Sequence, residues 1–325
     1  MLKGLFVLDP SSYDAIYSPQ EREQIGSMVQ IYASPQTAQT VYQNPQVLVP
    51  AEVIFSGWGC PVFTEDLLRH TPSLRVVFYG AGSIKYFVTD PFWERNIQVT
   101  SAYAANAVPV VEYCLGHILL GLKTTWQQAL LCRQKHTFER LPVAGAYGST
   151  VGLVSLGMIG RMLVERLKTF DVRILAYDPL LDEYLGVTLC SLEEIFMQSD
   201  VVSVHTPWLK ETEGLITGAH LEMMKPYSTF INSSRGAIVR EAEMIDVLRQ
   251  RADLTAVLDV TRPEPPLADS TLYTLPNVIL TPHIAGSVGS ECQRMGQYMV
   301  EELRRYLAGQ PLKYALSRHQ VEKMA

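Results

Sequence analysis

The sequence predicts an α/β protein built from two doubly wound parallel-sheet domains. Short apolar runs alternate along the chain with helix-length amphipathic segments. The length of 325 residues exceeds the usual size of one hydrophobic core, and a composition of 47% hydrophobic and 18% charged residues is typical of a folded globular protein. The runs that we expect to form strands are 5–8, 52–55, 75–79, 151–155, 173–177, 201–205, 229–232, 255–260 and 277–281.

Two long helices are expected in addition to the shorter segments between the strands. The longest runs from Ala107 to about Lys135, because its apolar residues follow helical spacing and no breaker interrupts them. Pro109 fits the first turn of this helix, where the missing amide donor costs little. The second runs from about Glu291 to Leu307.

The domain boundaries are expected just before these two helices, near Ala104 and Ser287. One domain would then be discontinuous and comprise residues 1–103 and 288–325. The other, residues 104–287, would be inserted into it, and a cleft would lie between the two.

Charge and cysteine content exclude several classes of partner. The formal net charge is -6 and no dense Lys/Arg run is present, so we expect no nucleic-acid partner. The five cysteines are far apart without a CxxC pair, which predicts neither disulfides nor a metal site. The apolar N-terminal run stops at Asp9, and no stretch approaches about 20 uninterrupted apolar residues. We therefore expect no membrane association and a cytoplasmic location.

A dinucleotide-binding turn is expected after the run 151–155, where strand, tight turn, helix and second strand follow one another. Gly157 would let the backbone approach a pyrophosphate, and Gly160 would let helix and strand pack closely. The backbone amides of Met158 and Ile159 would face the phosphates at the helix N-terminus. The alternative is a glycine-bearing turn that binds nothing.

Two residues qualify this cofactor prediction. Ser155 occupies the place where the tight turn normally has its first glycine. Asp178 ends the second strand, where a carboxylate accepts hydrogen bonds from ribose hydroxyls and repels the 2′-phosphate of NADP. The sequence therefore favours NAD (NADH) over NADP.

Polar residues also follow three later runs, in INSSRGAIV, LDVTRPEPP and LTPHIAG. Together with the glycine turn, HTPWLKETEGLI from His205 and ANAVPVVEY from Ala105, these segments resemble the D-isomer-specific 2-hydroxyacid dehydrogenase family. The resemblance extends from about Gly80 to Gly286. It implies a Rossmann NAD-binding domain inserted into a flavodoxin-like substrate domain, and hydride transfer between nicotinamide and a small 2-hydroxy or 2-keto acid.

The resemblance also implies three catalytic residues. Arg235 would bind the substrate carboxylate and polarise the carbonyl, and a planar fork of charged donors suits that task. His283 would be the general acid in reduction and the base in oxidation, since an imidazole titrates near neutrality. Glu264 would orient the His283 ring. The alternatives are a surface ion pair for the arginine and ordinary polar loop positions for the other two residues.

Further residues are expected around the cofactor and the substrate. Asp259 would accept a hydrogen bond from the nicotinamide carboxamide, or else form a turn or a helix cap. Arg235 and His283 would contact both cofactor and substrate. The remaining residues expected to line the ribose and nicotinamide are His205, Thr206, Pro207, Thr212 and Ser234, and we expect His205 to line the pocket rather than transfer protons.

The sequence says least about the residues that would bind the substrate. By resemblance, the backbone amides of Ala81 and Gly82 would bind the substrate carboxylate. The next residues, 83–85, depart from the family pattern, as does Arg240, which replaces an aspartate. Trp58 and Tyr79 are candidates for the substrate pocket, or for ordinary packing. Glyoxylate, hydroxypyruvate, pyruvate, branched 2-keto acids and 3-phosphoglycerate are all compatible with these motifs.

Two hypotheses of function follow. The first is an NADH-dependent reductase of a 2-keto acid that closes around its substrate. The second is a catalytically idle NAD(H)-sensing binding protein of the same fold, as some relatives act in transcriptional repression. The helix after Ala107 is more apolar than one buried face requires, so a homodimer built through it is expected, as is usual for relatives.

Overall fold

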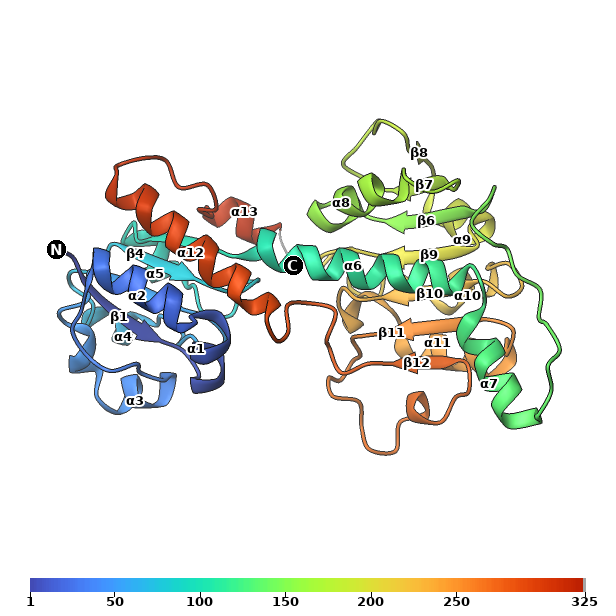
Figure 1. Ribbon diagram of the computed structural model, residues 1–325, viewed down its shortest axis with the longest axis horizontal. Helices are drawn as coiled ribbons and strands as arrows, with labels where there is room; N and C mark the ends of the chain where they lie inside the picture. Colours follow the sequence, from blue (N-terminus) through green and yellow to red (C-terminus); the bar gives the residue numbers. More distant parts are fainter. Residues whose placement is uncertain (324–325) are drawn as a thin grey trace. The chain divides into compact units, whose positions relative to one another are not determined.

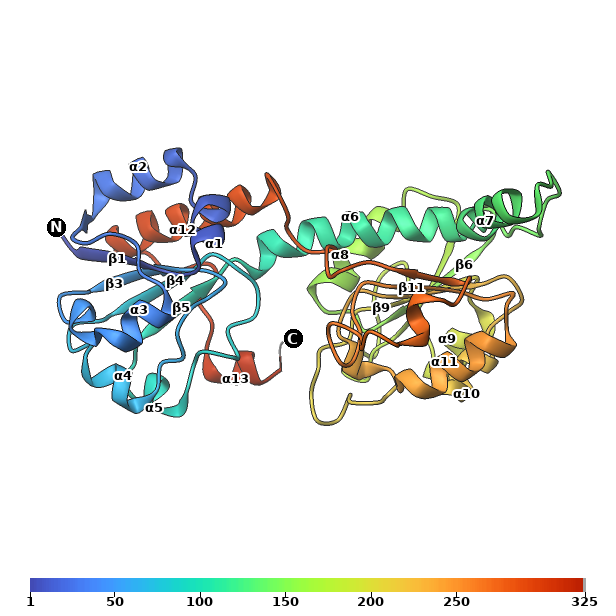
Figure 2. The same ribbon diagram turned by 90° about the horizontal axis from the view of Figure 1, so that it is seen from below.

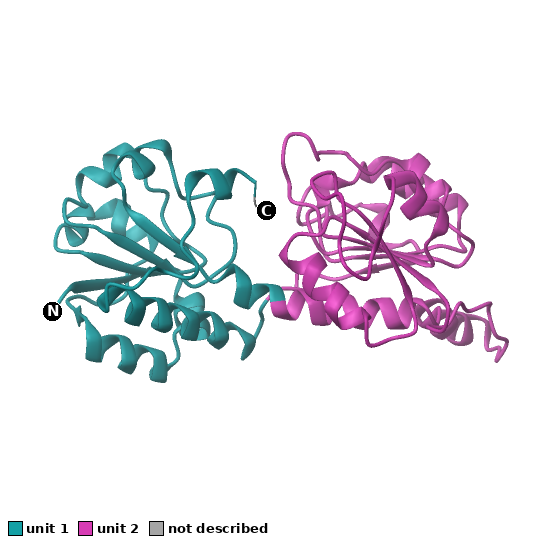
Figure 3. Ribbon diagram, turned by 90° about the horizontal axis from the view of Figure 1, so that it is seen from above, with its two compact units in different colours: residues 1–107, 287–324 teal, residues 108–286, 325 magenta. Residues whose placement is uncertain are grey.

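The computed structural model describes residues 1–323 and divides them into two compact units (Figure 3). Within the described residues, unit 1 comprises Met1–Ala107 and 287–323, and unit 2 comprises Val108–Gly286. The expected boundaries, after residues 103 and 287, lie within a few residues of these limits. Positions 324–325, which the expected discontinuous domain includes, lie outside the described residues.

Unit 1 contains a five-stranded parallel sheet in the order β2-β1-β3-β4-β5. This is the flavodoxin-like strand order, and it confirms the expected fold of this unit. The direction of winding reverses between β1 and β3, which makes the carboxyl ends of these two strands a topological switch point. The strands are β1 Lys3–Val7, β2 Gln30–Ile31, β3 Val53–Ser56, β4 Val76–Tyr79 and β5 Gln98–Ser101.

Helices cover both faces of this sheet (Figure 2). One face packs against α1 (Pro10–Ile16), α2 (Pro19–Met28) and α12 (Glu291–Leu307), and α12 has the bounds that the sequence predicts. Because side chains alternate along a strand, Phe6, Phe55 and Phe78 face this side whereas Leu5, Val7 and Val77 face the other. The second face is covered by α3 (Ala38–Gln43), the 3₁₀ turn η1 (Pro45–Leu48), α4 (Glu65–Arg69), α5 (Asp90–Glu94) and α13 (Arg318–Glu322).

Unit 2 contains a seven-stranded parallel sheet in the order β12-β11-β10-β9-β6-β7-β8 (Figure 1). When β6 is counted as the first strand of the unit, this strand order is that of the Rossmann fold with one strand added. It confirms the expected fold of this unit. Its switch point lies between β6 and β9. The strands are β6 Thr150–Val154, β7 Arg173–Tyr177, β8 Thr188–Leu189, β9 Val201–Val204, β10 Thr229–Asn232, β11 Thr255–Leu258 and β12 Val278–Leu280.

The helices of unit 2 also form two layers (Figure 2). One face of the sheet packs against α6 (Tyr103–Gly121) and α8 (Met158–Leu167). The other face packs against α9 (Leu192–Gln198), α10 (Gly218–Glu222) and α11 (Glu241–Gln250). The remaining elements are α7 (Thr125–Lys135), η2 (Gly236–Ile238) and η3 (Thr271–Tyr273).

The single helix expected over 107–135 is wrong in its start and in its continuity. The Ser101 hydroxyl accepts the Tyr103 amide at 3.2 Å, so α6 begins at Tyr103 and Pro109 lies inside the helix rather than in its first turn. At the other end, Thr124 has a left-handed backbone (φ 47°) and donates its amide to the Gly121 carbonyl at 2.8 Å. This closed turn separates α6 from α7.

α6 is the one helix in residues 1–323 that is long and apolar enough to span a bilayer by length and composition alone. Its residues Val110, Val111, Cys114 and Ile118 are buried against the sheet of unit 2, as in the core helix of an α/β domain. Only 44% of the 18-residue apolar stretch of α6 is buried, and no residue of α7 is buried. Within residues 103–135 no large apolar side chain is exposed, but several are only partly buried.

Candidate active site

The turn after β6 has the left-handed backbone that a dinucleotide-binding turn requires. Ser155 adopts φ 76°, a region that favours glycine. Two hydrogen bonds hold it there, because its amide donates to the Tyr177 carbonyl at 2.7 Å and its hydroxyl lies 2.9 Å from the Thr206 hydroxyl. The second bond crosses the switch point between β6 and β9. A serine at this position is thus accommodated by a partner on the neighbouring strand end.

The helix after this turn begins with free donors. A Cβ atom at Gly160 would lie 2.4 Å from the Ser155 carbonyl oxygen, so only glycine allows the helix to start this close to the turn. A Cβ atom at Gly157 would meet nothing within 4 Å. Among the described residues, the backbone amides of Gly157, Met158 and Ile159 have no hydrogen-bond acceptor. This N-terminus of α8 therefore offers open space and amides that suit a phosphate.

Asp178 connects the turn to the end of β7. Its Oδ2 accepts the Leu156 amide at 2.8 Å and its Oδ1 accepts the Leu180 amide at 2.9 Å. Each carboxylate oxygen has a second acceptor position, so both can still accept a ribose hydroxyl. Beyond Asp178 the chain encloses a pocket of about 620 Å³, whose lining is Asp182, Glu183, Tyr184, Leu185, Gly186, Val187 and Leu189.

The segment after β9 is fixed by internal hydrogen bonds. The Ser234 hydroxyl donates to the Thr206 carbonyl at 2.6 Å, and the Thr212 hydroxyl donates to the Pro207 carbonyl at 2.6 Å. His205 is only 9% exposed, and its Nε2 has no hydrogen-bond partner among the described residues. Burial lowers the pKa of His205 to about 4, so its imidazole is neutral near pH 7.

Arg235 lies at the carboxyl end of the neighbouring strand, β10. Its side chain is partly buried and donates from Nη1 to the Ser234 carbonyl at 2.6 Å, while its own carbonyl accepts the Asn232 side-chain amide at 3.1 Å. Burial lowers the pKa of the Arg235 guanidinium, and the negative charge of Glu264 acts in the opposite direction. Arg235 and Glu264 therefore lie within electrostatic reach of each other.

His283 and Glu264 form a direct pair. Nδ1 of His283 lies 2.5 Å from Oε1 of Glu264, and both side chains are nearly half exposed. Glu264 belongs to the loop after β11, and His283 to the loop after β12, the adjacent strand. His283 has a left-handed backbone (φ 53°), and its amide donates to the Asp259 carbonyl at 3.0 Å. The two predicted partners are thus brought together from different loops.

Asp259 organises the His283 loop. Its Oδ1 accepts the Thr281 hydroxyl at 2.6 Å and the Ile284 amide at 2.8 Å, and its Oδ2 accepts the Ala285 amide at 2.9 Å. The Tyr113 hydroxyl of α6 lies 2.8 Å from the Thr281 hydroxyl. Asp259 therefore has the turn-forming role that the sequence left open, and one acceptor position on Oδ2 remains for a further donor.

The sequence analysis missed a cluster that joins the loops after β9 and β11. The Glu213 carboxylate accepts hydrogen bonds from Nε1 of Trp208 at 3.1 Å and from Nη1 of Arg262 at 2.6 Å. The Arg262 guanidinium also lies 5.3 Å from the Trp208 ring centroid. Arg262 immediately precedes the Pro263–Glu264 segment. The signal in the sequence is weak, because Arg262 is 49 residues away from Glu213 along the chain.

Arg240, the departure noted in the sequence, stabilises the same region. Its Nε donates to the Gly214 carbonyl at 3.2 Å, and its Nη1 pairs with Glu243 at 3.2 Å. An arginine here can therefore hold the end of the 205–216 segment against α11.

In unit 1, the loop after β4 contains two backbone amides without an acceptor in the described part of the chain, one in buried Ala81 and one in partly buried Gly82. The Ser101 hydroxyl donates to the Ala81 carbonyl at 2.9 Å and also contacts the Gly82 carbonyl. With both carbonyls held by Ser101, the amides of Ala81 and Gly82 have no acceptor among residues 1–323. Of the two, the amide of partly exposed Gly82 is the donor suited to a carboxylate.

The described residues contain no group of three or more His, Cys, Asp or Glu side chains that could hold a metal ion. All five cysteines are free in the same part of the chain.

Comparison with known proteins gives one consistent result. The family model for the NAD-binding domain of D-isomer specific 2-hydroxyacid dehydrogenases matches residues 116–285. A putative 2-hydroxyacid dehydrogenase of Bacillus subtilis is 33% identical over 237 residues, which cover 69% of this chain and 68% of that protein. D-3-phosphoglycerate dehydrogenase of Mycobacterium tuberculosis is 32% identical over 251 residues, 75% of this chain and 47% of that enzyme. The chain thus spans about half the length of the phosphoglycerate dehydrogenases it matches.

Solved structures agree on the fold. The NAD-complexed form of a D-isomer specific 2-hydroxyacid dehydrogenase from Lactobacillus delbrueckii ssp. bulgaricus superimposes with a TM-score of 0.81 at 19% identity, covering 97% of this chain and all of that one (100%). None of these similarities assigns roles to individual residues of this chain. The catalytic, cofactor and substrate roles of the residues above stay predictions.

Proposed function

Because the chain belongs to the D-isomer specific 2-hydroxyacid dehydrogenase family, we propose that it is an NAD-dependent oxidoreductase that interconverts a small 2-keto acid and the D-2-hydroxy acid. The observation that carries this proposal is the His283–Glu264 pair beside Arg235. The three residues follow β12, β11 and β10, which are neighbours in the sheet, so they gather at its carboxyl edge.

Each residue has a role that its geometry supports. Arg235 binds the substrate carboxylate and polarises the keto oxygen with its charged donors. Nicotinamide, when bound, supplies the hydride that adds to the carbonyl carbon. His283 gives a proton from Nε2 to the carbonyl oxygen, while Glu264 accepts from Nδ1 and holds the ring in that orientation. Oxidation of the hydroxy acid reverses these steps, with His283 as the base.

The proposal includes NAD in preference to NADP. The free amides at the N-terminus of α8 and the carboxylate of Asp178 suit a pyrophosphate and a ribose diol. Asp182 and Glu183, in the pocket beyond Asp178, add negative charge to the region where a 2′-phosphate would be repelled.

A homodimer built through α6 and α7 is also part of the proposal. The partly buried apolar side chains of these helices support it, as does the exposure of Phe138 and Tyr147 in the segment that follows α7. Light scattering of the purified protein should give about twice the chain mass of 36.4 kDa. A mass of one chain across the micromolar range would remove this part of the proposal.

The experiment follows NADH absorbance with a panel of 2-keto acids, with NADPH as the second cofactor. We expect turnover of at least one acid with NADH, and a fall in kcat of about 100-fold or more in His283→Ala, the loss expected for a general acid. His319→Ala, which removes an exposed histidine of α13, serves as the matched control and should keep full activity.

Two outcomes would contradict the proposal. A kcat of His283→Ala within about threefold of the unchanged protein would show that His283 is not the general acid. NADH binding without turnover of any acid would favour the NAD(H)-sensing alternative.

A further inference from the structure

The carboxyl edge of the unit 1 sheet carries aromatic side chains at its switch point, between β1 and β3. The chain leaves β1 toward Asp9 and leaves β3 toward Trp58, and the Asp9 amide donates to the Trp58 carbonyl at 3.0 Å. Ligands of doubly wound sheets bind at the carboxyl ends of the strands beside such a switch point. These two residues therefore occupy the part of unit 1 where a ligand is expected.

Tyr86 belongs to the same group of residues. Its hydroxyl accepts the Cys60 amide at 3.2 Å and lies 3.3 Å from the Tyr79 hydroxyl. Since this polar end is occupied, the exposed part of the side chain is mainly its ring. Tyr86 is 48% exposed and Trp58 is 38% exposed, whereas Cys60 and Tyr79 are buried. The loops that follow β3 and β4 thus each carry a partly exposed aromatic side chain.

The thiol and the phenol of this group are uncharged. Burial raises the pKa of the Cys60 thiol and of the Tyr86 phenol to about 12, so both are neutral at pH 7. The charged residue of this group is Asp9. Its carboxylate packs so closely on Gly59 that a Cβ atom at Gly59 would lie 2.2 Å from Cγ of Asp9. Asp9 would repel a phosphate or a second carboxylate on a ligand.

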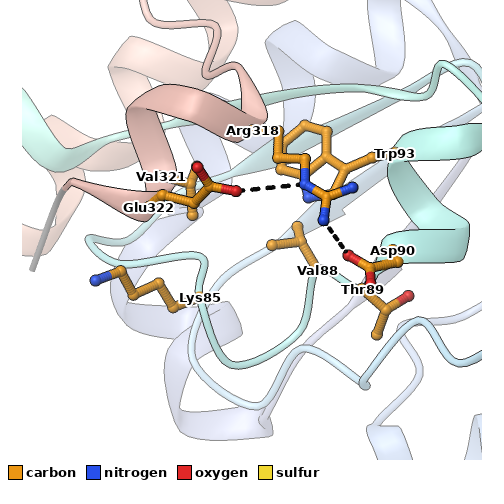
Figure 4. Close-up of a pocket in the computed structure, with 8 residues that line it drawn as sticks. All are labelled: Lys85, Val88, Thr89, Asp90, Trp93, Arg318, Val321 and Glu322. Atoms are coloured by element: carbon orange, nitrogen blue, oxygen red, sulfur yellow. Dashed lines mark hydrogen bonds and ion pairs between the residues drawn. The ribbon is translucent and has the colours of Figure 1, made fainter. Parts of the chain in front are cut away.

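Lys85, the cation of the 80–89 loop, lines a different pocket (Figure 4). That pocket lies between α5 and α13 and includes Asp90, Arg318 and Glu322. Arg318 is paired there with Asp90 at 2.8 Å and with Glu322 at 3.4 Å. Both cations thus line the pocket at α5 and α13.

We propose that the unit 1 switch point receives the side chain of the 2-keto acid, and that Trp58, Tyr86 and Asp9 select an uncharged aromatic or large apolar group over a phosphorylated or dicarboxylic one. This inference rests on the proposed function, in which the substrate is a small 2-keto acid. The Gly82 amide, which by resemblance would bind the substrate carboxylate, lies in the loop that leads to Tyr86, so carboxylate and side chain would be recognised by adjacent parts of one loop.

The expected selectivity is large enough to measure. Burial of a phenyl group contributes about 2 to 3 kcal/mol relative to leaving it in water, or about 30-fold to 150-fold in kcat/KM. Phenylpyruvate should therefore exceed glyoxylate by about 100-fold in kcat/KM. Phosphohydroxypyruvate and 2-oxoglutarate, which place an anion at the same point, should rank below pyruvate because Asp9 repels them.

The experiment measures kcat/KM for phenylpyruvate, 4-methyl-2-oxopentanoate, pyruvate, glyoxylate, phosphohydroxypyruvate and 2-oxoglutarate with NADH. Trp58→Ala and Tyr86→Ala should each lower the ratio of phenylpyruvate to glyoxylate by about tenfold, because each removes one aromatic wall. Asp9→Asn should raise the ratio of phosphohydroxypyruvate to pyruvate. Tyr273→Ala, which removes an exposed aromatic ring of unit 2, is the matched control and should leave both ratios unchanged.

The possible failures are distinguishable. Reduction of none of the acids would sink the proposed function itself. Reduction with glyoxylate or phosphohydroxypyruvate preferred would overturn this inference and leave the proposed function standing. Because the ranking is measured first on the unaltered protein, and Asp9→Asn tests charge independently of the aromatic rings, a variant that fails to fold does not decide the outcome.

Discussion

At the scale of single residues, the burial of His205 couples the stability of unit 2 to pH. Burial lowers the pKa of His205 from its ordinary 6.5 to about 4, so below pH 6.5 the unfolded chain takes up a proton that the folded chain refuses. Above pH 6.5 the His205 imidazole is neutral in both the folded and the unfolded chain, so its burial costs no stability. As the pH falls from 6.5 toward 4, protonation of His205 in the unfolded chain progressively lowers the free energy of unfolding. We expect it to lower the free energy of unfolding by about 2 kcal/mol between pH 7 and pH 5.

Urea unfolding at the two pH values measures this effect. His205→Asn, which cannot titrate, should reduce the loss between pH 7 and pH 5 by that amount, whereas His319→Ala, an exposed histidine, should not. An equal loss in His205→Asn and in the unaltered protein would show that His205 does not sense this pH range.

The limits of sequence reading are also visible at this scale. The sequence shows that Ser155 replaces a glycine, yet the Thr206 hydroxyl that supports it belongs to the segment after β9, a strand that becomes a neighbour of β6 only in the folded sheet. The same holds for Asp259, whose bonds to Thr281, Ile284 and Ala285 depend on the pairing of β11 with β12. A residue type is readable from the sequence, whereas its partners depend on long-range topology.

At the scale of elements, the apolar runs predict nine strands correctly, and the three that were missed have a common cause. β2 and β8 are two residues long, and β5 reads Gln-Val-Thr-Ser, so none presents a continuous apolar run. Their positions are set by pairing with β1, β7 and β4. The break between α6 and α7 escaped notice for a related reason, since apolar spacing carries no sign of the left-handed turn at Thr124.

The loop that carries Glu264 should depend on its contact with the loop after β9. Arg262 pairs with Glu213 and lies against Trp208, and this cluster fixes the segment just before Glu264. We expect Arg262→Ala to lower kcat by about tenfold, because displacement of an orienting group by a fraction of an ångström is costly in catalysis. The KM for NADH should change by less than about twofold, since Asp178 and the N-terminus of α8 are untouched.

Arg249→Ala provides the comparison, because Arg249 also forms an ion pair, with Asp246 on α11, but lies on another element. Steady-state kinetics with the 2-keto acid that is reduced most efficiently would measure kcat and the KM for NADH of both variants. Equal kcat values for Arg262→Ala and Arg249→Ala would mean that the cluster does not position Glu264.

At the scale of the whole molecule, each unit has its own hydrophobic core on both faces of its own sheet, so each can unfold as a separate transition. The four tryptophans are divided equally, with Trp58 and Trp93 in unit 1 and Trp126 and Trp208 in unit 2. A Trp58→Phe/Trp93→Phe variant therefore reports unit 2 by fluorescence, and a Trp126→Phe/Trp208→Phe variant reports unit 1.

NADH should stabilise one of these transitions selectively. The residues that suit the dinucleotide, from Ser155 to Asp178, all belong to unit 2, and a ligand that binds only the folded state at 100 times its Kd adds about 2.7 kcal/mol. We expect the denaturant midpoint of unit 2 to rise by the equivalent amount and that of unit 1 to stay nearly constant. A rise of equal size in both variants would instead mean that α6, which begins in unit 1 and continues into unit 2, makes the chain unfold as a single cooperative body.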